Sequence, residues 1–274
     1  MRIKIKHETS YAYAKPATST LQLLRMTPRS SACQFVRRWR VEVDVDARLD
    51  RSEDAFGNIT HMIFAQGPIE NLQIVVEGDV HTHDTGGLVK GTVERIPASF
   101  FLRDTPLTRA SAELKQFARD QLAAEGGDRL ATLHAINNAI FDDMKFCTES
   151  TTAATTAAES FAHRAGVCQD YAHIMIAAAR TLGAPARYVS GYYMRTDTDT
   201  QDAGHAWAEA HVDGLGWIGF DPAHGMCVTD QYVRVAIGAD HNEAAPVRGS
   251  QIGGQDEKLD VSIVMQQGQQ IIES

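Results

Sequence analysis

The chain of 274 residues has no uninterrupted hydrophobic run long enough to cross a membrane. Its first ten residues contain no apolar segment of the kind found in a secretory signal. Basic residues are also in deficit, since 26 Lys and Arg face 35 Asp and Glu and give a formal net charge of −9. An acidic surface repels phosphate backbones. The sequence therefore predicts a cytoplasmic protein with neither a membrane nor a nucleic acid as partner.

Cysteine is scarce as well. The four cysteines, Cys33, Cys147, Cys168 and Cys227, are scattered and form no C-x-x-C motif. A disulfide framework needs denser, paired spacing. We therefore expect four free thiols in a reducing compartment, where a catalytic thiol can persist. The rest of the composition, with 43% hydrophobic and 22% charged residues, is that of a globular protein.

The first hundred residues show the alternation of short β-strands. Trp39, Val41, Val43 and Val45 alternate with charged residues, as on a half-buried strand. Further apolar stretches at 59–64 and 72–80 follow turn residues and predict more strands. Glycines and prolines then interrupt the chain. We predict a β-sandwich-like N-terminal module over residues 1–98.

Residues 99–274 show a mixed pattern of helices and strands. Helical periodicity covers 109–124 and 128–143, a capping box precedes a short helix at 156, and another helix covers 168–182. Strands are predicted at 186–194, 205–212 and 217–220. We expect the last alternating stretch, 259–265, to pack back on a sheet, with that of the N-terminal module as one candidate. The fold class is therefore α+β.

Cys168 stands where a nucleophilic thiol would be well placed. It follows the break at Gly166 and begins a predicted helix. A helix N-terminus favours negative charge and so stabilises a thiolate. The unpaired N–H groups of the first turn can also face a developing oxyanion. A lone cysteine is more often a small packed hydrophobe, so Cys168 alone leaves both interpretations open.

His205 and Asp221 supply possible partners for this thiol. His205 opens one predicted strand and Asp221 closes the next. If the two strands form a hairpin centred on residues 213 and 214, the two side chains lie at the same end. A carboxylate beside an imidazole fixes its tautomer and stabilises its protonated form. The spacing therefore predicts a Cys-His-Asp set, against the alternatives of a surface histidine and a turn aspartate.

Three segments in this order are familiar. GVCQDYAH (166–173), GHAWAE (204–209) and GWIGFDP (216–222) closely resemble the catalytic motifs of the transglutaminase-like superfamily. Within it, the chain resembles the bacterial transglutaminase-like cysteine peptidases. HETSY (7–11), TPR (27–29) and DAFGN (54–58) are similar to the β-rich module that precedes the core in that group, and VAIGAD (235–240) with APVRG (245–249) is similar to its C-terminal signature.

The resemblance implies a papain-like catalytic core over residues 99–274, C-terminal extension included. It makes Cys168 the nucleophile, His205 the general base and acid, and Asp221 the orienting group, acting on a peptide or protein amide through a thioester and without a cofactor. The chain departs from the group in two places. Ala223 and His224 stand where threonine and asparagine are usual, and a glycine usual near residues 148–149 is absent. Both departures concern the loops and the choice of substrate.

Several neighbouring residues have two interpretations. Gln169 and Trp207 are candidate substrate-binding residues, although core packing is an equal role for the tryptophan. Glu209 is expected to have a structural partner. His205, His211, His224 and Asp221 invite a zinc site, but their spacing matches no recognised ligand pattern, so we predict no metal. Three functions stay open at this point, namely an amide hydrolase, an acyl transferase to amines and a non-enzymatic binding module.

Overall fold

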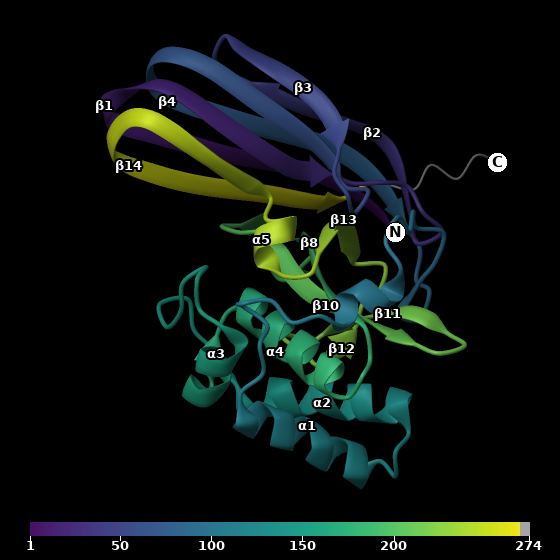
Figure 1. Cartoon of the computed structure of the whole chain (residues 1–274). Coiled ribbons are helices and arrows are strands. Elements are labelled where there is room, and N and C mark those ends of the chain that lie inside the picture. The colour runs from purple at the N-terminus through teal and green to yellow at the C-terminus, as the bar shows by residue number, and fades with distance from the viewer. Residues whose placement is uncertain (269–274) are drawn as a thin grey trace, which may run out of the picture.

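The fold is built from two antiparallel sheets and a group of helices, as seen in a computed structural model that describes residues 1–268 (Figure 1). Each sheet has six strands. The first sheet forms the upper part of the molecule in Figure 1, and the second lies below it, between the first sheet and the helices. The chain is thus rich in β-structure and has one helical face.

Long strands from both ends of the chain make up most of the first sheet, and the two-residue β9 is added at one edge. Its order is β2-β4-β1-β14-β9, with β3 paired to β4. The bounds are β1 (Arg2–Thr27), β2 (Gln34–Val43), β3 (Ala47–Glu53), β4 (Ile59–Thr82), β9 (Thr200–Gln201) and β14 (Val247–Gln267). The pairing of β14 with β1 runs from Ile3 opposite Gln267 to Leu24 opposite Val247. The prediction that the C-terminal stretch returns to a sheet is confirmed, and the sheet is that of the N-terminal part.

Strands predicted as separate short pieces are continuous here. β4 joins the predicted stretches 59–64 and 72–80 into one strand of 24 residues. The buried residues of β1 belong to two hydrophobic cores. Ile3 and Ile5 pack in the core that contains the helices, whereas Leu24 and Met26 belong to a separate core formed by the first sheet. The first sheet therefore has a hydrophobic core of its own and also contributes residues to the core of the helical part.

The second sheet carries the strands of His205 and Asp221. Its order is β12-β11-β10-β8-β13, with the short β5 paired to β11. The bounds are β5 (Leu88–Val89), β8 (Ala186–Tyr193), β10 (His205–Val212), β11 (Gly216–Asp221), β12 (Met226–Cys227) and β13 (Tyr232–Gly238). Burial is nearly continuous along β8, β10 and β11, since this sheet is covered on both faces.

Helices cover the lower face of this sheet (Figure 1). They are α1 (Ala112–Ala124), α2 (Arg129–Asp143), α3 (Ala157–His163) and α4 (Cys168–Thr181). The short α5 (His241–Ala244) lies higher, beside β13 and β8. A 3-10 helix at Ala98–Leu102 and a two-strand ladder of β6 (Lys145–Phe146) and β7 (Ala165–Gly166) are further elements. Ser111, Asp128 and Thr156 accept hydrogen bonds from first-turn N–H groups and so define three helix starts. The capping box predicted at Thr156 is present.

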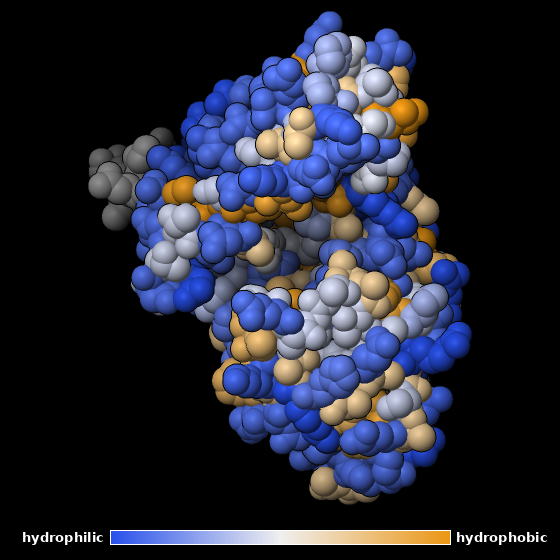
Figure 2. Space-filling view, turned by 90° about the vertical axis from the view of Figure 1, so that its left-hand side faces the viewer, coloured by the Kyte–Doolittle hydropathy of each residue, from blue (hydrophilic) through white to orange (hydrophobic). Residues whose placement is uncertain are grey.

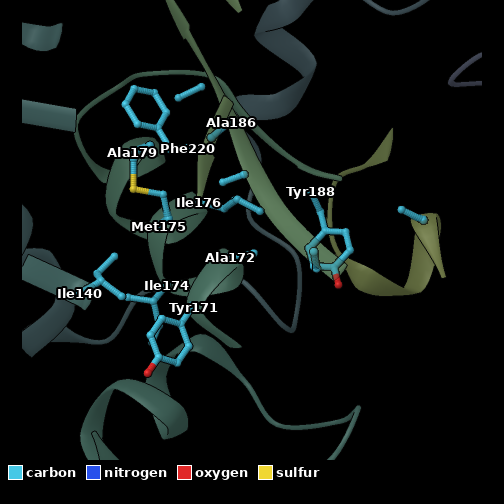
Figure 3. Packing of buried hydrophobic residues seen from close by; sticks show 14 of the residues in the cluster. Ile140, Tyr171, Ala172, Ile174, Met175, Ile176, Ala179, Ala186, Tyr188 and Phe220 are labelled. Carbon is cyan, nitrogen blue, oxygen red and sulfur yellow. The ribbon is translucent and has the colours of Figure 1, made fainter. Parts of the chain in front are cut away.

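Helix α4 is the central helix of the catalytic half. It packs against β8, β10 and the three other long or medium helices. Figure 3 shows its apolar side chains, among them Ala172, Met175 and Ile176, packed between the sheet and the surrounding helices. Such a helix is rigid because every face of it is held by neighbours. Its first residue is Cys168, which is therefore placed on a fixed element.

Polar contacts also join the two halves of the molecule. The Asn58 amide, at the end of the predicted turn, bonds the carbonyl and the N–H of Ile237 on β13. Gln34 does the same to Arg234. Trp39 packs over Gly78, where an added Cβ would meet the indole ring at 1.9 Å, and also contacts Tyr192. The glycine is therefore required by close packing.

On the face shown in Figure 2, a recess lies between the β-rich upper part and the helical lower part, with hydrophobic residues along its upper border.

All four cysteines are free thiols, as the sequence predicts. Within residues 1–268, no helix has both the length and the apolar character needed to cross a membrane.

Candidate active site

The turn before α4 fixes the position of Cys168. Asp170, in the first helical turn, is 1% exposed and accepts hydrogen bonds from the Val167 N–H at 2.8 Å and from the Thr151 hydroxyl at 2.7 Å. Gly166 leaves room for this carboxylate, since an added Cβ would lie 2.6 Å from its Oδ2 atom. Burial raises the pKa of Asp170, against the effect of these hydrogen bonds. The capping carboxylate, the loop at Thr151 and the nucleophile turn thus form one unit.

The hairpin of β10 and β11 brings His205 and Asp221 together. The Nε2 atom of His205 lies 2.6 Å from the Asp221 Oδ2 atom, and the carboxylate is fully buried. The hairpin register differs from the predicted one, because Ala208 is opposite Phe220 and His211 is opposite Trp217. Asp221 is therefore a diagonal neighbour of His205 and not its direct partner. The two residues still meet, since diagonal side chains on one face remain within reach.

The side chain of Cys168 lies close enough to the same imidazole to raise its pKa. Because Nε2 contacts Asp221, Nδ1 is the ring nitrogen left free for the thiol. The structure thus places the three predicted residues in one chain of contacts, Cys168 to His205 to Asp221. They come from three elements, the start of α4, the start of β10 and the end of β11.

The electrostatics of this chain favour a charged imidazole. Burial lowers the pKa of His205, but the Asp221 carboxylate and the Cys168 thiolate outweigh it and raise the pKa to about 10. Burial likewise acts to raise the pKa of Asp221, and the opposing attraction of His205 holds it well below its usual range. At neutral pH the arrangement therefore holds a protonated imidazole beside the Asp221 carboxylate, with the side chain of Cys168 close to the same ring.

Asp221 has further partners that the sequence analysis did not identify. The Tyr232 hydroxyl donates to Oδ2 at 2.7 Å, and the Ala223 N–H donates to Oδ1 at 3.0 Å. Tyr232 comes from β13, and no sequence signal links it to Asp221 because the contact depends on the strand order. The hydrogen bonds from these donors offset the free-energy cost of burying the carboxylate, which would be large for an unpaired charge.

His224 also binds Asp221. Its Nδ1 atom lies 2.7 Å from the same Oδ2 atom that His205 contacts. Since a carboxylate accepts and does not donate, both imidazoles donate to it. The ring of His224 packs on Tyr193 with centroids 4.4 Å apart and lies 5.0 Å from the ring of His205. The residue that departs from the usual pattern after Asp-Pro is therefore part of the site.

The two candidate substrate-binding residues lie in different surroundings. The Gln169 side chain bonds the carbonyl of Ala153 at 3.1 Å, so it holds the loop beside the nucleophile. Trp207 is 1% exposed and packs against Tyr232 beneath His205. A side chain this deeply buried supports the imidazole from below and offers no surface to a substrate.

Glu209 has the structural partners that the sequence analysis expects. It is fully buried and bonds Arg187 and Arg234, each through the arginine Nε at 2.6 Å. Burial acts to raise the pKa of Glu209, but the two arginines outweigh it and lower the pKa to about 2. Arg187 continues the network to Glu94 at 2.7 Å and stacks over Trp217. This network fixes β10, the strand that begins with His205.

One group of possible metal ligands coincides with the site. One ligand atom each from His205, Asp221 and His224 lies within 4.8 Å of the others. His211, the fourth residue considered from the sequence, lies elsewhere, beside Trp217 and Asp213. The hydrogen bonds described above explain the present arrangement of the three residues.

Comparisons with known proteins agree with this architecture. Residues 115–222 match the family model of the transglutaminase-like superfamily, and residues 3–81 match that of the bacterial transglutaminase-like N-terminal region. An uncharacterised protein of Mycobacterium leprae is 28% identical over 277 residues, covering 96% of this chain and 97% of its own. An uncharacterised protein of Mycobacterium tuberculosis is 28% identical over 290 residues, covering 96% and 91%.

A solved structure shares the fold. The crystal structure of a candidate cysteine protease from Cytophaga hutchinsonii superimposes with a TM-score of 0.74 at 20% identity, and the match covers 97% of this chain and 98% of that one. The papain-like fold of the core is consistent with the two family models that match the chain. The chain combines a transglutaminase-like core at residues 115–222 with a bacterial transglutaminase-like N-terminal region at residues 3–81.

Proposed function

We propose that this protein is a cysteine enzyme that hydrolyses an amide or peptide bond. One observation carries the proposal: the Cys168 thiol, at the start of a buried helix, lies close to an imidazole whose Nε2 atom bonds a buried carboxylate. A thiol in this setting is a nucleophile with its own general acid and base. The fold of the solved cysteine protease candidate is consistent with this role.

In the first step, the Cys168 thiolate attacks the carbonyl carbon of the amide. The carbonyl oxygen becomes negative and faces the unpaired N–H groups at the start of α4. His205 then gives its proton to the leaving nitrogen as the C–N bond breaks. The products are a free amine and a thioester between the acyl group and Cys168.

In the second step, His205, now neutral, removes a proton from water. The hydroxide attacks the thioester carbon, and the acid product leaves as the thiolate and imidazolium form again. Asp221 keeps the ring aligned throughout, because its bond to Nε2 leaves Nδ1 directed at the thiol. An amine in place of water would give transamidation by the same route.

The proposed substrate is a peptide or protein amide, and the proposed location is the cytoplasm. The free thiols support a reducing compartment, because cysteines persist unpaired where glutathione and thioredoxin keep them reduced. The route described uses side chains and backbone groups of this chain alone.

The experiment is a comparison of the wild-type protein with Cys168→Ala on a broad peptide mixture, read by mass spectrometry, with and without an added primary amine. Hydrolysed products that form only with the wild type support the proposal. Amine adducts formed in preference to hydrolysis would assign acyl transfer. Products that are equal in both proteins, or absent from both, would contradict the enzyme and favour a binding module.

A further inference from the structure

A second histidine shares the catalytic carboxylate, and this is unusual chemistry for an orienting aspartate. His205 Nε2 and His224 Nδ1 both lie at hydrogen-bond distance from Asp221 Oδ2, at 2.6 Å and 2.7 Å. Amide hydrolysis as proposed above needs the first contact and not the second. Two imidazole nitrogens and a carboxylate oxygen converging on one point are also a common ligand set for zinc.

We propose that His205, Asp221 and His224 form a binding site for Zn²⁺, which would switch the catalytic pair off reversibly. The three ligand atoms lie within 4.8 Å of one another. Imidazole nitrogen and carboxylate oxygen bind zinc at about 2.0–2.2 Å, so neighbouring ligands of a tetrahedral ion stand roughly 3.3 Å apart. The present contacts must therefore open by a fraction of an ångström.

His224 can supply that movement. Its side chain is 35% exposed, compared with 10% for His205 and 0% for Asp221. It follows β11 in a turn, so its side chain is less confined than the two strand residues. The exposed edge of His224 also gives an ion a route to the carboxylate that does not pass through the core.

The exchange of protons for the metal balances. Zinc takes the place of the Nε2 proton of His205, which is released, and that ring keeps its Nδ1 proton toward Cys168. Zinc also takes the place of the Nδ1 proton of His224, and this neutral ring gains a proton on Nε2 from solvent. A water molecule completes four ligands, as in open zinc sites.

The remaining partners of Asp221 are suited to an outer shell. The Tyr232 hydroxyl and the Ala223 N–H hold the carboxylate in place, and neither needs to move when its histidine contacts are exchanged for metal. Hydrogen bonds of this kind orient metal ligands and strengthen binding. The carboxylate is therefore positioned before an ion arrives.

Cys168 is not a ligand in this arrangement. The Nε2 atom of His205 faces Asp221, so the ion would sit on that side of the ring, and Nδ1 stays free for the thiol. Metal binding would instead remove the bond between His205 and Asp221, on which the orientation of the imidazole depends.

The test is a titration with Zn²⁺ alone, monitored by competition with a chromophoric chelator, in the Cys168→Ala protein. This background removes the nucleophile thiol and leaves the three proposed ligands. We expect one tight equivalent of Zn²⁺ whose affinity falls at least about tenfold in Cys168→Ala/His224→Asn, because a direct ligand is lost. The matched control is Cys168→Ala/His211→Asn, which removes a histidine at the far end of β10, the strand that begins with His205. This variant should bind Zn²⁺ as the parent does.

Unchanged affinity on loss of His224, or an equal loss in the His211 control, would overturn the site. So would the absence of a tight equivalent from a parent protein whose thermal unfolding midpoint matches that of the wild type. The titration involves no turnover. A failure of amide hydrolysis would therefore leave this result unaffected, and the two proposals can fail separately.

Discussion

His205 and Asp221 are joined by a 2.6 Å hydrogen bond although they do not stand opposite each other in their hairpin. The carboxylate reaches the imidazole diagonally from the end of β11. At that position it also receives the Tyr232 hydroxyl from β13, three strands away in the sheet order. The diagonal geometry thus lets one buried oxygen of Asp221 accept hydrogen bonds both from His205 and from Tyr232 on the edge strand β13.

Replacing Asp221 by asparagine should move the alkaline limb of the pH profile. Burial lowers the pKa of His205, and Asp221 is the main opposing influence that raises it to about 10. Without the negative charge, the imidazolium loses its proton at lower pH. We expect the alkaline limb of kcat/KM to fall by at least about one pH unit. Asp213→Asn, an exposed aspartate in the same hairpin, serves as control, and equal limbs in the two variants would contradict this role for Asp221.

Tyr232→Phe should lower the free energy of unfolding, because it removes the hydroxyl and keeps the ring that packs in the core. The variant removes one donor to a buried carboxylate, and a hydrogen bond to a charged group contributes about 1.5–3 kcal/mol. Urea unfolding of both proteins measures the loss. Tyr13→Phe is a matched comparison, since that hydroxyl makes a longer contact of 3.4 Å with neutral Gln251. A loss for Tyr232→Phe no larger than for Tyr13→Phe would show that Asp221 does not depend on this donor.

The Glu209 network predicts a large and local effect on stability. Glu209→Gln leaves Arg187 and Arg234 without their shared buried anion, and breaking such a pair costs about 3–5 kcal/mol. Glu77→Gln removes one of the two carboxylate partners of the exposed Arg40 and should cost less than about 1 kcal/mol. Denaturant unfolding of the two variants checks the difference. Similar losses would mean that the buried network is not what holds β10.

Stability should also depend on pH through His205. Its pKa in the folded protein is raised to about 10 from an ordinary value near 6.5, so the folded state binds this proton more tightly than the unfolded state. The contribution is complete below about pH 6.5 and is lost as the pH rises toward 10. The difference in unfolding free energy between the wild type and His205→Gln should therefore shrink between pH 6 and pH 9.5. A difference that stays constant would show that folding does not raise this pKa.

Much of the site could be predicted because its signals are local. The helix that begins at Cys168 and the strand that begins at His205 follow from breaks and alternation within a few residues. The return of β14 to the first sheet was also predictable, since an isolated apolar strand needs a partner. These are features that short-range periodicity specifies.

The rest depends on which strands become neighbours. Tyr232 meets Asp221, and Arg234 meets Glu209, only because β13 joins the sheet beside β8. The hairpin register was predicted two residues away from the observed one, since the loop at 213–216 contains glycines with φ of 80° and 88° that allow a longer turn. Trp207 has a pattern compatible with either a cleft or a core, and only the packing of the sheet places it in the core.

The central claim is that Cys168 is held as an activated thiolate by His205, and it can be tested against three internal controls. Cys33, Cys147 and Cys227 are free thiols in the same chain. Limited alkylation with iodoacetamide at neutral pH, followed by peptide mass spectrometry, gives the rate at each cysteine. The account predicts that Cys168 reacts at least about tenfold faster than the other three and that His205→Ala removes this advantage. Alkylation of Cys168 at the rate of the other thiols, or a rate unaffected by His205→Ala, would contradict it.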